Sequence, residues 1–192
     1  MQLNPIVNHE QLRLFCSLPS SVVLQPELPS MQQADAHWAV CDDQGQILAR
    51  CSLWWTQVPP YTAQHLGLIG HYAARNERAA RMLIDHACAQ LAAHQCTMVV
   101  GPMDGSTFRH YRFVTERAVG GELHPTFFLE PDNPDEWPSH FLARGFEPLA
   151  HYFSAVGSLP EEDPRAGATS SRIAEQDIQI RTVNVSIIES EL

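Results

Sequence analysis

Residues 65–100 read HLGLIGHYAARNERAARMLIDHACAQLAAHQCTMVV, and this stretch decides the fold. It opens with an apolar run of β type over residues 65–72 and closes with another over residues 97–100. Asn76 is a good N-cap for a helix between the two runs. Apolar residues then recur at the spacing of one helix face: Ala80, Leu83, Ile84, Ala87, Cys88 and Leu91. The stretch therefore predicts strand, helix and strand in succession, which is typical of α/β or α+β proteins.

The sequence before this unit predicts more strands. Residues 37–41 and 46–55 are rich in β-forming residues and flank Asp42-Asp43-Gln44-Gly45, a polar turn that contains glycine, so they predict a hairpin. Residues 2–7 form a further candidate strand, and Asn8 can cap a helix over residues 10–18.

The sequence after the unit predicts a helix and two extended segments. Residues 126–130 are expected to be extended and residues 135–144 to be helical, with Gly145 as the helix stop. Residues 146–156 are expected to form a last long strand.

Composition divides the chain into one domain and a remainder. Residues 1–157 are expected to form the domain, and residues 158–176 to be a linker that begins with a run of proline, glycine and small polar residues. Residues 177–192 are a strand-like tail. They are either the start of a second domain, a strand that adds to a partner's sheet in a homodimer, or a disordered tail.

Charge and residue usage exclude several function classes. The formal net charge is -10, so a nucleic-acid partner is not expected, because a polyanion is repelled at long range. All 12 basic residues are arginine. The absence of lysine excludes Schiff-base and pyridoxal-phosphate enzymes and Walker-A loops, which need an amine at a defined place.

The five cysteines are an odd set without a C-x-x-C pair, which is typical of reduced, cytoplasmic thiols. Neither a signal peptide nor an apolar run long enough for a membrane span is visible, so we expect no membrane partner. We expect no metal either, since His86 and His94 lie eight residues apart rather than the four that a helical pair of ligands needs.

An arginine cluster marks the start of the central helix. Arg75, Arg78 and Arg81 stand where positive charge opposes the helix dipole, at a cost of about 0.3–1 kcal/mol each when exposed. An acidic chain that places arginines there is expected to bind an anion, with help from the backbone N–H groups of the first turn. The alternative is a solvated face on which Glu77 softens the repulsion.

The order of elements around this cluster resembles the acyl-CoA core of the GNAT superfamily of N-acetyltransferases. Those proteins have Gln/Arg-x-x-Gly-x-Gly/Ala between the strand and the helix; Arg75 and Ala80 fit this pattern, whereas Arg78 stands in place of the first glycine. The run from Phe141 to Phe146 resembles the family's Tyr-x-x-x-Gly-Phe. Segments 101–112 and 128–138 resemble a group of poorly characterised bacterial GNAT-like proteins.

The resemblance implies a mixed, mostly antiparallel sheet flanked by helices, and acetyl-CoA or another acyl-CoA as co-substrate. The acceptor is expected to be a small-molecule amine or a peptide. The backbone near 69–71 would pair with the pantetheine arm and the turn near 75–81 would hold the pyrophosphate. The expected cofactor-binding residues are Ile69, Gly70, His71, Arg75, Arg78, Ala79, Ala80 and Arg81.

Acyl transfer from a thioester to an amine needs a base for the ammonium proton and an acid for the thiolate. The candidate catalytic residues are His71, Tyr111 and Glu130. The candidate acceptor-binding residues are Trp54, Trp55, Arg109, His110 and Arg112. Because neighbours on a strand point to opposite faces, only one of Trp54 and Trp55 is expected to pack inward.

One departure from the family pattern keeps a second function open. Phe141 stands where many GNAT enzymes have the tyrosine that protonates the departing thiolate, and a phenyl ring has no proton to give. The alternative to an N-acyltransferase is a GNAT-like module that binds CoA or a metabolite without catalysis, and a domain without any ligand site is a third.

Overall fold

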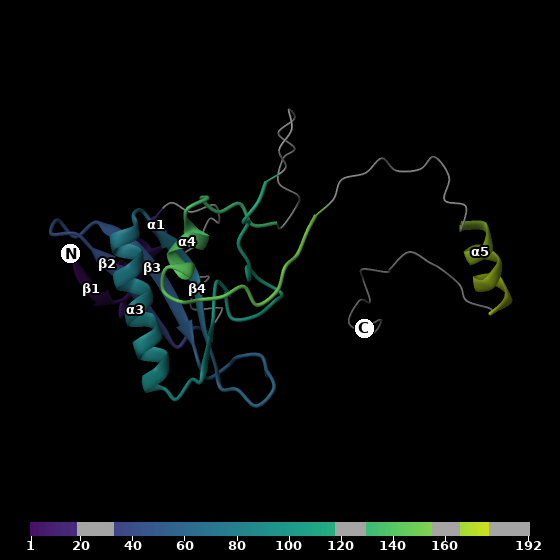
Figure 1. Cartoon of the computed structure of the whole chain (residues 1–192), viewed down its shortest axis with the longest axis horizontal. Coiled ribbons are helices and arrows are strands. Elements are labelled where there is room, and N and C mark those ends of the chain that lie inside the picture. Colours follow the sequence, from purple (N-terminus) through teal and green to yellow (C-terminus); the bar gives the residue numbers. More distant parts are fainter. Residues whose placement is uncertain (19–32, 118–129, 155–165, 177–192) are drawn as a thin grey trace. The chain divides into compact units, whose positions relative to one another are not determined.

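A computed structural model describes residues 1–18, 33–117, 130–154 and 166–176 of the 192-residue chain. Contacts divide the chain into two units, Met1–Pro148 and Leu149–Leu192. The first unit contains the sheet and every candidate site residue (Figure 1).

The first unit is built on one five-stranded sheet in the order β1-β2-β3-β4-β5. Its strands are β1 (Gln2–Pro5), β2 (Ala36–Cys41), β3 (Ile47–Trp54), β4 (Leu66–Ala74) and β5 (Met98–Val100). Neighbouring strands pair antiparallel except β4 and β5, which are parallel. The predicted fold class, a mixed and mostly antiparallel sheet flanked by helices, is confirmed.

The predicted central helix is α3 (Glu77–Ala93), and it covers one face of the sheet. Asn76 caps it as expected, because its side chain accepts a hydrogen bond from the N–H of Ala79 at 2.9 Å. The predicted apolar face is confirmed, with Cys88 only half-buried. The fully buried residues are Ala79, Ala80, Leu83, Ile84, Ala87 and Leu91.

The opposite face of the sheet is covered by α1 (His9–Ser17), which Asn8 caps as predicted. Alternate residues of β3 point to the two faces. Ala49, Cys51 and Leu53 join the core that contains α3. Arg50, Ser52 and Trp54 point to the α1 side, where the Arg50 guanidinium lies 5.2 Å from the centre of the Phe15 ring. One face of the sheet is therefore an ordinary apolar core, and the other buries polar groups.

A bulge interrupts β4 in its middle. Arg50 pairs with Ala73 but Ser52 pairs with Gly70, so two residues of β4 face one residue of β3. His71 lies in the bulge with a φ of 47°, in the left-handed region that non-glycine residues rarely adopt. Such a conformation costs on the order of 1–3 kcal/mol and persists only where surrounding contacts hold it.

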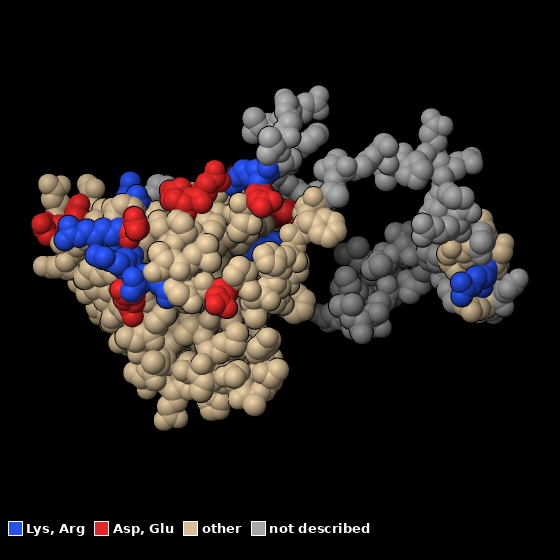
Figure 2. Space-filling model, in the orientation of Figure 1, with Lys and Arg blue, Asp and Glu red and all other residues tan. Residues whose placement is uncertain are grey.

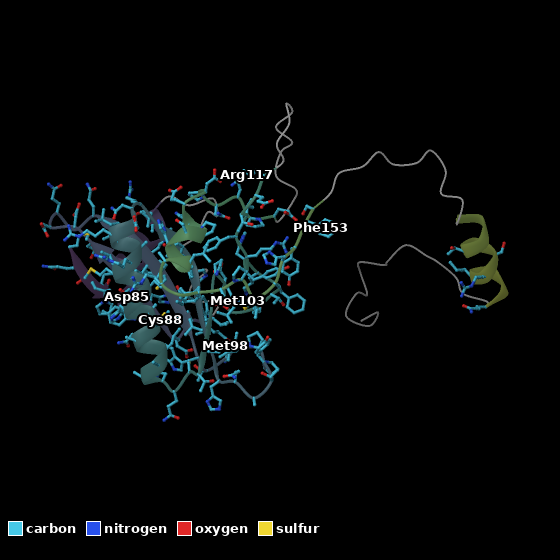
Figure 3. The ribbon with its side chains drawn as sticks, in the orientation of Figure 1. Asp85, Cys88, Met98, Met103, Arg117 and Phe153 are labelled. Carbon is cyan, nitrogen blue, oxygen red and sulfur yellow. The ribbon has the colours of Figure 1, made fainter. Side chains whose placement is uncertain are left out.

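The segment after β5 provides those contacts. The N–H of Met103 donates to the carbonyl oxygen of Ile69 at 2.8 Å, and the carboxylate of Asp104 accepts the N–H of His71 at 2.6 Å. The chain thus continues alongside β4 after the parallel ladder ends at Leu68 and Val100. Figure 3 labels Met98 and Met103, near the two ends of this run.

The last helix of the first unit, α4 (Trp137–Leu142), lies within the predicted range, and Gly145 ends it with a φ of 83°. The indole N–H of Trp137 donates to the carbonyl oxygen of Ala74 at 3.1 Å. Just after α4, Arg144 donates to Asp85 of α3 at 2.7 Å. These contacts hold α4 against β4 and α3.

One expectation about the chain after residue 145 is wrong. No strand forms over residues 146–154, the described part of the predicted strand 146–156, where all residues except half-buried Phe146 are exposed. A β-type pattern needs a neighbouring strand, and Pro148 lacks the N–H that a ladder uses. The predicted linker contains a helix, α5 (Ala166–Glu175). Strands were also predicted for two segments that lie outside the described residues, 126–129 and 177–192. No described helix is long and apolar enough to cross a membrane.

Gly70 should prove essential to the packing of the segment after β5. A Cβ at this position would lie 2.3 Å from the carbonyl oxygen of Met103 and 2.6 Å from a carboxylate oxygen of Asp104. We expect Gly70→Ala to lower the free energy of unfolding by about 1–3 kcal/mol, measured by urea denaturation. Gly167→Ala, whose Cβ would meet no atom within 4 Å, is the control and should cause no loss. Equal stabilities of wild type and Gly70→Ala would contradict the close packing.

Candidate functional site

A cluster of polar side chains is buried on the α1 side of the sheet around the β4 bulge. It draws on β2, β3, β4 and the segment after β5; the ring of His37 is half-buried and the other members are buried. Its members are His37, Arg50, Ser52, His71 and Asp104. Because buried polar groups cost free energy unless they are paired, such a cluster points to function more than an apolar core does.

Hydrogen bonds connect the cluster into a chain. The hydroxyl of Ser52 lies 2.7 Å from Nδ1 of His37 and 2.8 Å from Nδ1 of His71. Asp104 holds the other side of His71: one carboxylate oxygen accepts the backbone N–H, and the second lies 4.0 Å from Nε2 of the ring. Side-chain hydrogen bonds therefore run from His37 through Ser52 to the His71 ring, and Asp104 joins this chain through the backbone N–H of His71 and a 4.0 Å approach to the ring.

The loop after Asp104 folds back and fixes its backbone. The N–H of Asp104 donates to the carbonyl oxygen of His110 at 2.7 Å, and the guanidinium of Arg109 donates to the carbonyl oxygen of Asp104 at 3.2 Å. Gly105 makes this possible, because it adopts a φ of 85° and a Cβ there would lie 3.1 Å from Nε1 of Trp54. The Trp54 ring in turn packs edge-on against His71.

Burial controls the protonation of this cluster. It raises the pKa of Asp104 to about 6, against the opposing effects of the hydrogen bond from His71 and of the charges on Arg50 and Arg109. Burial also lowers the pKa of His71 well below its ordinary value, and the positive charge of Arg50 lowers it further. The pKa of His37 is lowered by burial too. At neutral pH the cluster therefore holds a carboxylate close to its titration range beside two neutral imidazoles, which suits proton transfer.

The predicted anion site lies at the start of α3. Arg75, Arg78 and Arg81 are exposed, and none of them forms an ion pair with another described residue. Figure 2 shows basic side chains gathered over the end of α3 where the helix begins. The N–H groups of Ala79 and Ala80 bond to Asn76, so an anion at this end would be bound by guanidinium groups and the N–H groups before Ala79.

Of the predicted acceptor-binding residues, three surround Asp104 and His71: Trp54, Arg109 and His110. Trp55 lies elsewhere, because its ring stacks on His94 at the end of α3 with centroids 3.8 Å apart. The two tryptophans belong to opposite faces of the sheet, but the expectation that only one of them packs inward is wrong, because Trp55 packs against the core on the α3 side.

The other predicted residues contact one another. The guanidinium of Arg112 donates to the hydroxyl of Tyr111 and, at 3.1 Å, to the carboxylate of Glu130. Ion pairing of this kind positions side chains without assigning them a chemical role, so the catalytic roles of Tyr111 and Glu130 stay predictions.

The backbone of β4 near Ile69 and His71 has fewer groups available to hydrogen-bond a pantetheine arm than the resemblance implies. The carbonyl of Ile69 and the N–H of His71 already bond to Met103 and Asp104. A pantetheine arm could pair there only if this segment moved. The next stretch of β4, from Tyr72 to Ala74, has Trp137 bonded to its last carbonyl.

Sequence reasoning missed Asp104, Ser52, His37 and Arg50. One signal was available: in ILARCSLW, Arg50 and Ser52 alternate with the apolar Ala49, Cys51 and Leu53, which places a charge and a hydroxyl on one face of a buried strand. Asp104 carries no such signal, because its position depends on the path of the chain after β5. Within the described ranges no cluster of metal-ligating side chains occurs.

Replacing Asp104 should change how stability depends on pH. The pKa of Asp104 is raised from 3.8 to about 6 on folding, so the folded protein binds a proton that the unfolded chain has released between these values. The free energy of unfolding therefore falls as pH rises through this window, by up to about 3 kcal/mol.

Asp104→Asn removes that fall, so its stability relative to wild type should rise between about pH 4 and pH 7 by up to about 3 kcal/mol. The measurement is urea denaturation at a series of pH values. The comparison at the acid end is the internal control, because both side chains are uncharged and nearly isosteric there. Parallel pH profiles for the two proteins would contradict the raised pKa.

Comparison with known proteins relates the chain to others by fold. No family model and no curated protein matches the sequence. The structure is similar to a mutant of the TTHA1254 protein from Thermus thermophilus, with 12% identity over 83% of this chain and 100% of that chain and a TM-score of 0.52. It is also similar to a tetramutant of the BH1408 protein from Bacillus halodurans, with 11% identity over 81% of this chain and 99% of that chain and a TM-score of 0.50.

An apo aminoglycoside antibiotic 6'-N-acetyltransferase from Acinetobacter haemolyticus matches with 15% identity over 83% of this chain and 100% of that chain. Its TM-score of 0.47 is too low to establish a common fold. The two higher-scoring matches are only 12% and 11% identical to this chain, so their similarity shows a common fold alone.

Proposed function

We propose that the protein is an N-acyltransferase that moves an acetyl or other acyl group from acyl-CoA to an amine. The observation that carries the proposal is the group of exposed arginines, Arg75, Arg78 and Arg81, at the start of α3 in a chain of net charge -10. The GNAT-like order of strand, arginine turn, helix and parallel strand supports it.

The arginine cluster fits the diphosphate of CoA. Three guanidinium groups within seven residues can each donate charge-assisted hydrogen bonds to phosphate oxygens. Helix dipole physics disfavours cations at this end, so a bound polyanion would turn an unfavourable arrangement into a favourable one. Arg78, in place of the family's first glycine, would bind phosphate through its side chain.

The cluster around Asp104 supplies the base for the acceptor amine. The Asp104 side chain is 10% exposed, whereas the His71 ring is sealed from solvent. Asp104, rather than His71, can therefore accept the ammonium proton, and His71 holds the carboxylate in place through its backbone N–H. A carboxylate with a pKa of about 6 is a suitable base near neutral pH and also attracts a cationic amine.

β4 connects the two ends of the proposed site. The stretch from Tyr72 to Ala74 separates the Asp104 cluster from the arginine turn, and the pantetheine arm would run along it. This placement requires Trp137 to release the carbonyl of Ala74, to which its indole N–H now bonds.

Reversing one charge should separate specific anion binding from general electrostatics. We expect Arg78→Glu to weaken CoA binding by at least about tenfold, since it replaces an attraction with a repulsion beside the phosphates. Isothermal titration calorimetry with CoA measures the effect. Arg13→Glu is the matched control, because Arg13 is also exposed but lies on α1, across the sheet, and its reversal should leave affinity nearly unchanged. Equal losses in both variants, or no loss in Arg78→Glu, would refute the phosphate site.

A second function, a module that binds CoA or a metabolite without catalysis, is favoured by the side chains around Gly101. Phe141 has no proton for a thiolate, and a Cβ on Gly101 would lie 2.8 Å from its ring. Its ring also packs 4.9 Å from Tyr72, and both belong with Trp137 to the apolar core. A site filled in this way binds a pantetheine arm only after rearrangement.

Thiol release distinguishes the two functions. With acetyl-CoA and a panel of small amines and peptides, the N-acyltransferase should release free CoA thiol only when an accepted amine is present. Asp104→Asn should lower that rate by about 10²–10⁴-fold, the usual contribution of a general base, while CoA affinity stays close to that of wild type. Binding of CoA without turnover on any amine would favour the non-catalytic module.

A further inference from the structure

The chain His37–Ser52–His71–Asp104 joins a nearly buried carboxylate to a ring that water reaches. Nε2 of His37 has no hydrogen-bond partner in the described part of the chain, and it is not among the buried polar atoms left unsatisfied there, so it is accessible to solvent. Ser52 is completely buried and its hydroxyl contacts Nδ1 of both histidines. A hydroxyl between two such nitrogens must donate to one and accept from the other, because it carries one hydrogen.

The Ser52 hydroxyl therefore allows two arrangements of protons along the chain, and the charge state of Asp104, whose carboxylate lies 4.0 Å from Nε2 of His71, selects between them. In the first, Asp104 is protonated and faces Nε2 of His71; Nδ1–H of His71 donates to Ser52; and Ser52 donates to Nδ1 of His37, which carries its hydrogen on Nε2. In the second, Asp104 is ionised, His71 carries its hydrogen on Nε2, Ser52 donates to His71, and Nδ1–H of His37 donates to Ser52.

The second arrangement has one proton fewer than the first. The carboxyl group of Asp104 first closes the 4.0 Å gap to Nε2 of His71 and passes its proton there. The Nδ1 proton of His71 then passes to Ser52, the Ser52 proton passes to Nδ1 of His37, and the Nε2 proton of His37 leaves to water. Both histidines are neutral at the start and at the end. The only net change is the loss of the proton of Asp104.

We propose that His37 and Ser52 form, with His71, a proton relay that carries the proton of Asp104 to solvent on the opposite side of the cluster. The relay extends the proposed acyl transfer, because it would empty the base after each amine deprotonation while the acceptor pocket is occupied. His37 and Ser52 are then positioning residues that act through His71, and neither touches the substrate.

The charges around the relay favour neutral rings. Arg50 from β3 and Arg109 from the loop both disfavour a cationic His71, and so does the neighbouring His110. On the α1 side, His37 packs edge-on against the Phe15 ring, and burial disfavours its charged form as well. A shift of hydrogens between neutral rings avoids the cost of a buried imidazolium.

Ring nitrogens observed by NMR test the relay without any substrate. In the full-length protein labelled with ¹⁵N-histidine, long-range ¹H–¹⁵N spectra show which nitrogen of each ring carries the hydrogen. Across the titration of Asp104, expected at about pH 6, the hydrogen of His71 should move from Nδ1 to Nε2 and that of His37 from Nε2 to Nδ1, with one shared midpoint. His37→Gln and His71→Gln assign the signals.

Variants locate the coupling. Ser52→Ala should leave the change at His71, which faces Asp104, and abolish it at His37; Ser52→Thr, which keeps the hydroxyl, should restore it. Asp104→Asn should abolish it at both rings. His86, a half-buried histidine on α3, is the control and should behave alike in wild type and Ser52→Ala.

A fixed tautomer of His37 in the wild-type protein overturns the relay whether or not any variant folds. The same change at His37 in Ser52→Ala also overturns it, because the path would then bypass Ser52. These spectra need neither CoA nor an amine. A failed relay therefore leaves the proposed acyl transfer standing, and an absence of acyl transfer leaves the relay standing.

Discussion

The hydrogen bond from the backbone N–H of His71 to the carboxylate of Asp104 determines the geometry of the whole site. It holds the β4 bulge, in which His71 adopts an unfavourable positive φ, and it fixes the segment after β5 against the outer edge of β4. It also holds the carboxylate at a buried position, and burial raises the pKa of Asp104 to about 6 although the hydrogen bond itself acts to lower it. One interaction therefore shapes the backbone and prepares a titratable group.

Apolar and polar side chains lie on opposite faces of the sheet because they alternate along β3. Ala49, Cys51 and Leu53 pack with α3, and the face between them carries Arg50 and Ser52. The α3 side can be close-packed and rigid because it contains almost no polar groups. The polar side depends on hydrogen bonds between side chains of neighbouring strands, which are electrostatically stronger in the protein interior than in water.

The sequence predicted most of the fold because local patterns determine it. The cap at Asn76, the apolar face of α3 and the turn at Gly45 each depend on residues close in the chain, and all three are confirmed. The strand predicted over residues 146–156 failed over its described part, because β-type alternation does not supply the neighbouring strand that a ladder requires. The arginine cluster was predictable for a similar reason to the cap, because its three residues lie within seven residues of the chain around the helix start.

The proton-transfer cluster was only partly predictable, because it forms from four separate stretches of chain. His71 was found from its place at the end of a strand. Its partners Ser52 and Asp104 lie 19 and 33 residues away, and no local pattern relates those distances to contact. The long-range step is the path of the chain past Met103, which depends on Gly70 having no side chain.

The distance along β4 limits which ligand could use both ends of the site. His71 and Arg75 are four residues apart, which corresponds to about 13 Å of extended chain. A free phosphate or diphosphate at the arginines could not also reach Asp104, whereas a ligand with a diphosphate at one end and a long, narrow arm could. This geometry favours a CoA thioester over a simple anion as the proposed ligand. It also makes Trp137 the residue on which access depends, because its indole now bonds to the carbonyl of Ala74, beside Arg75 at the arginine end of that path.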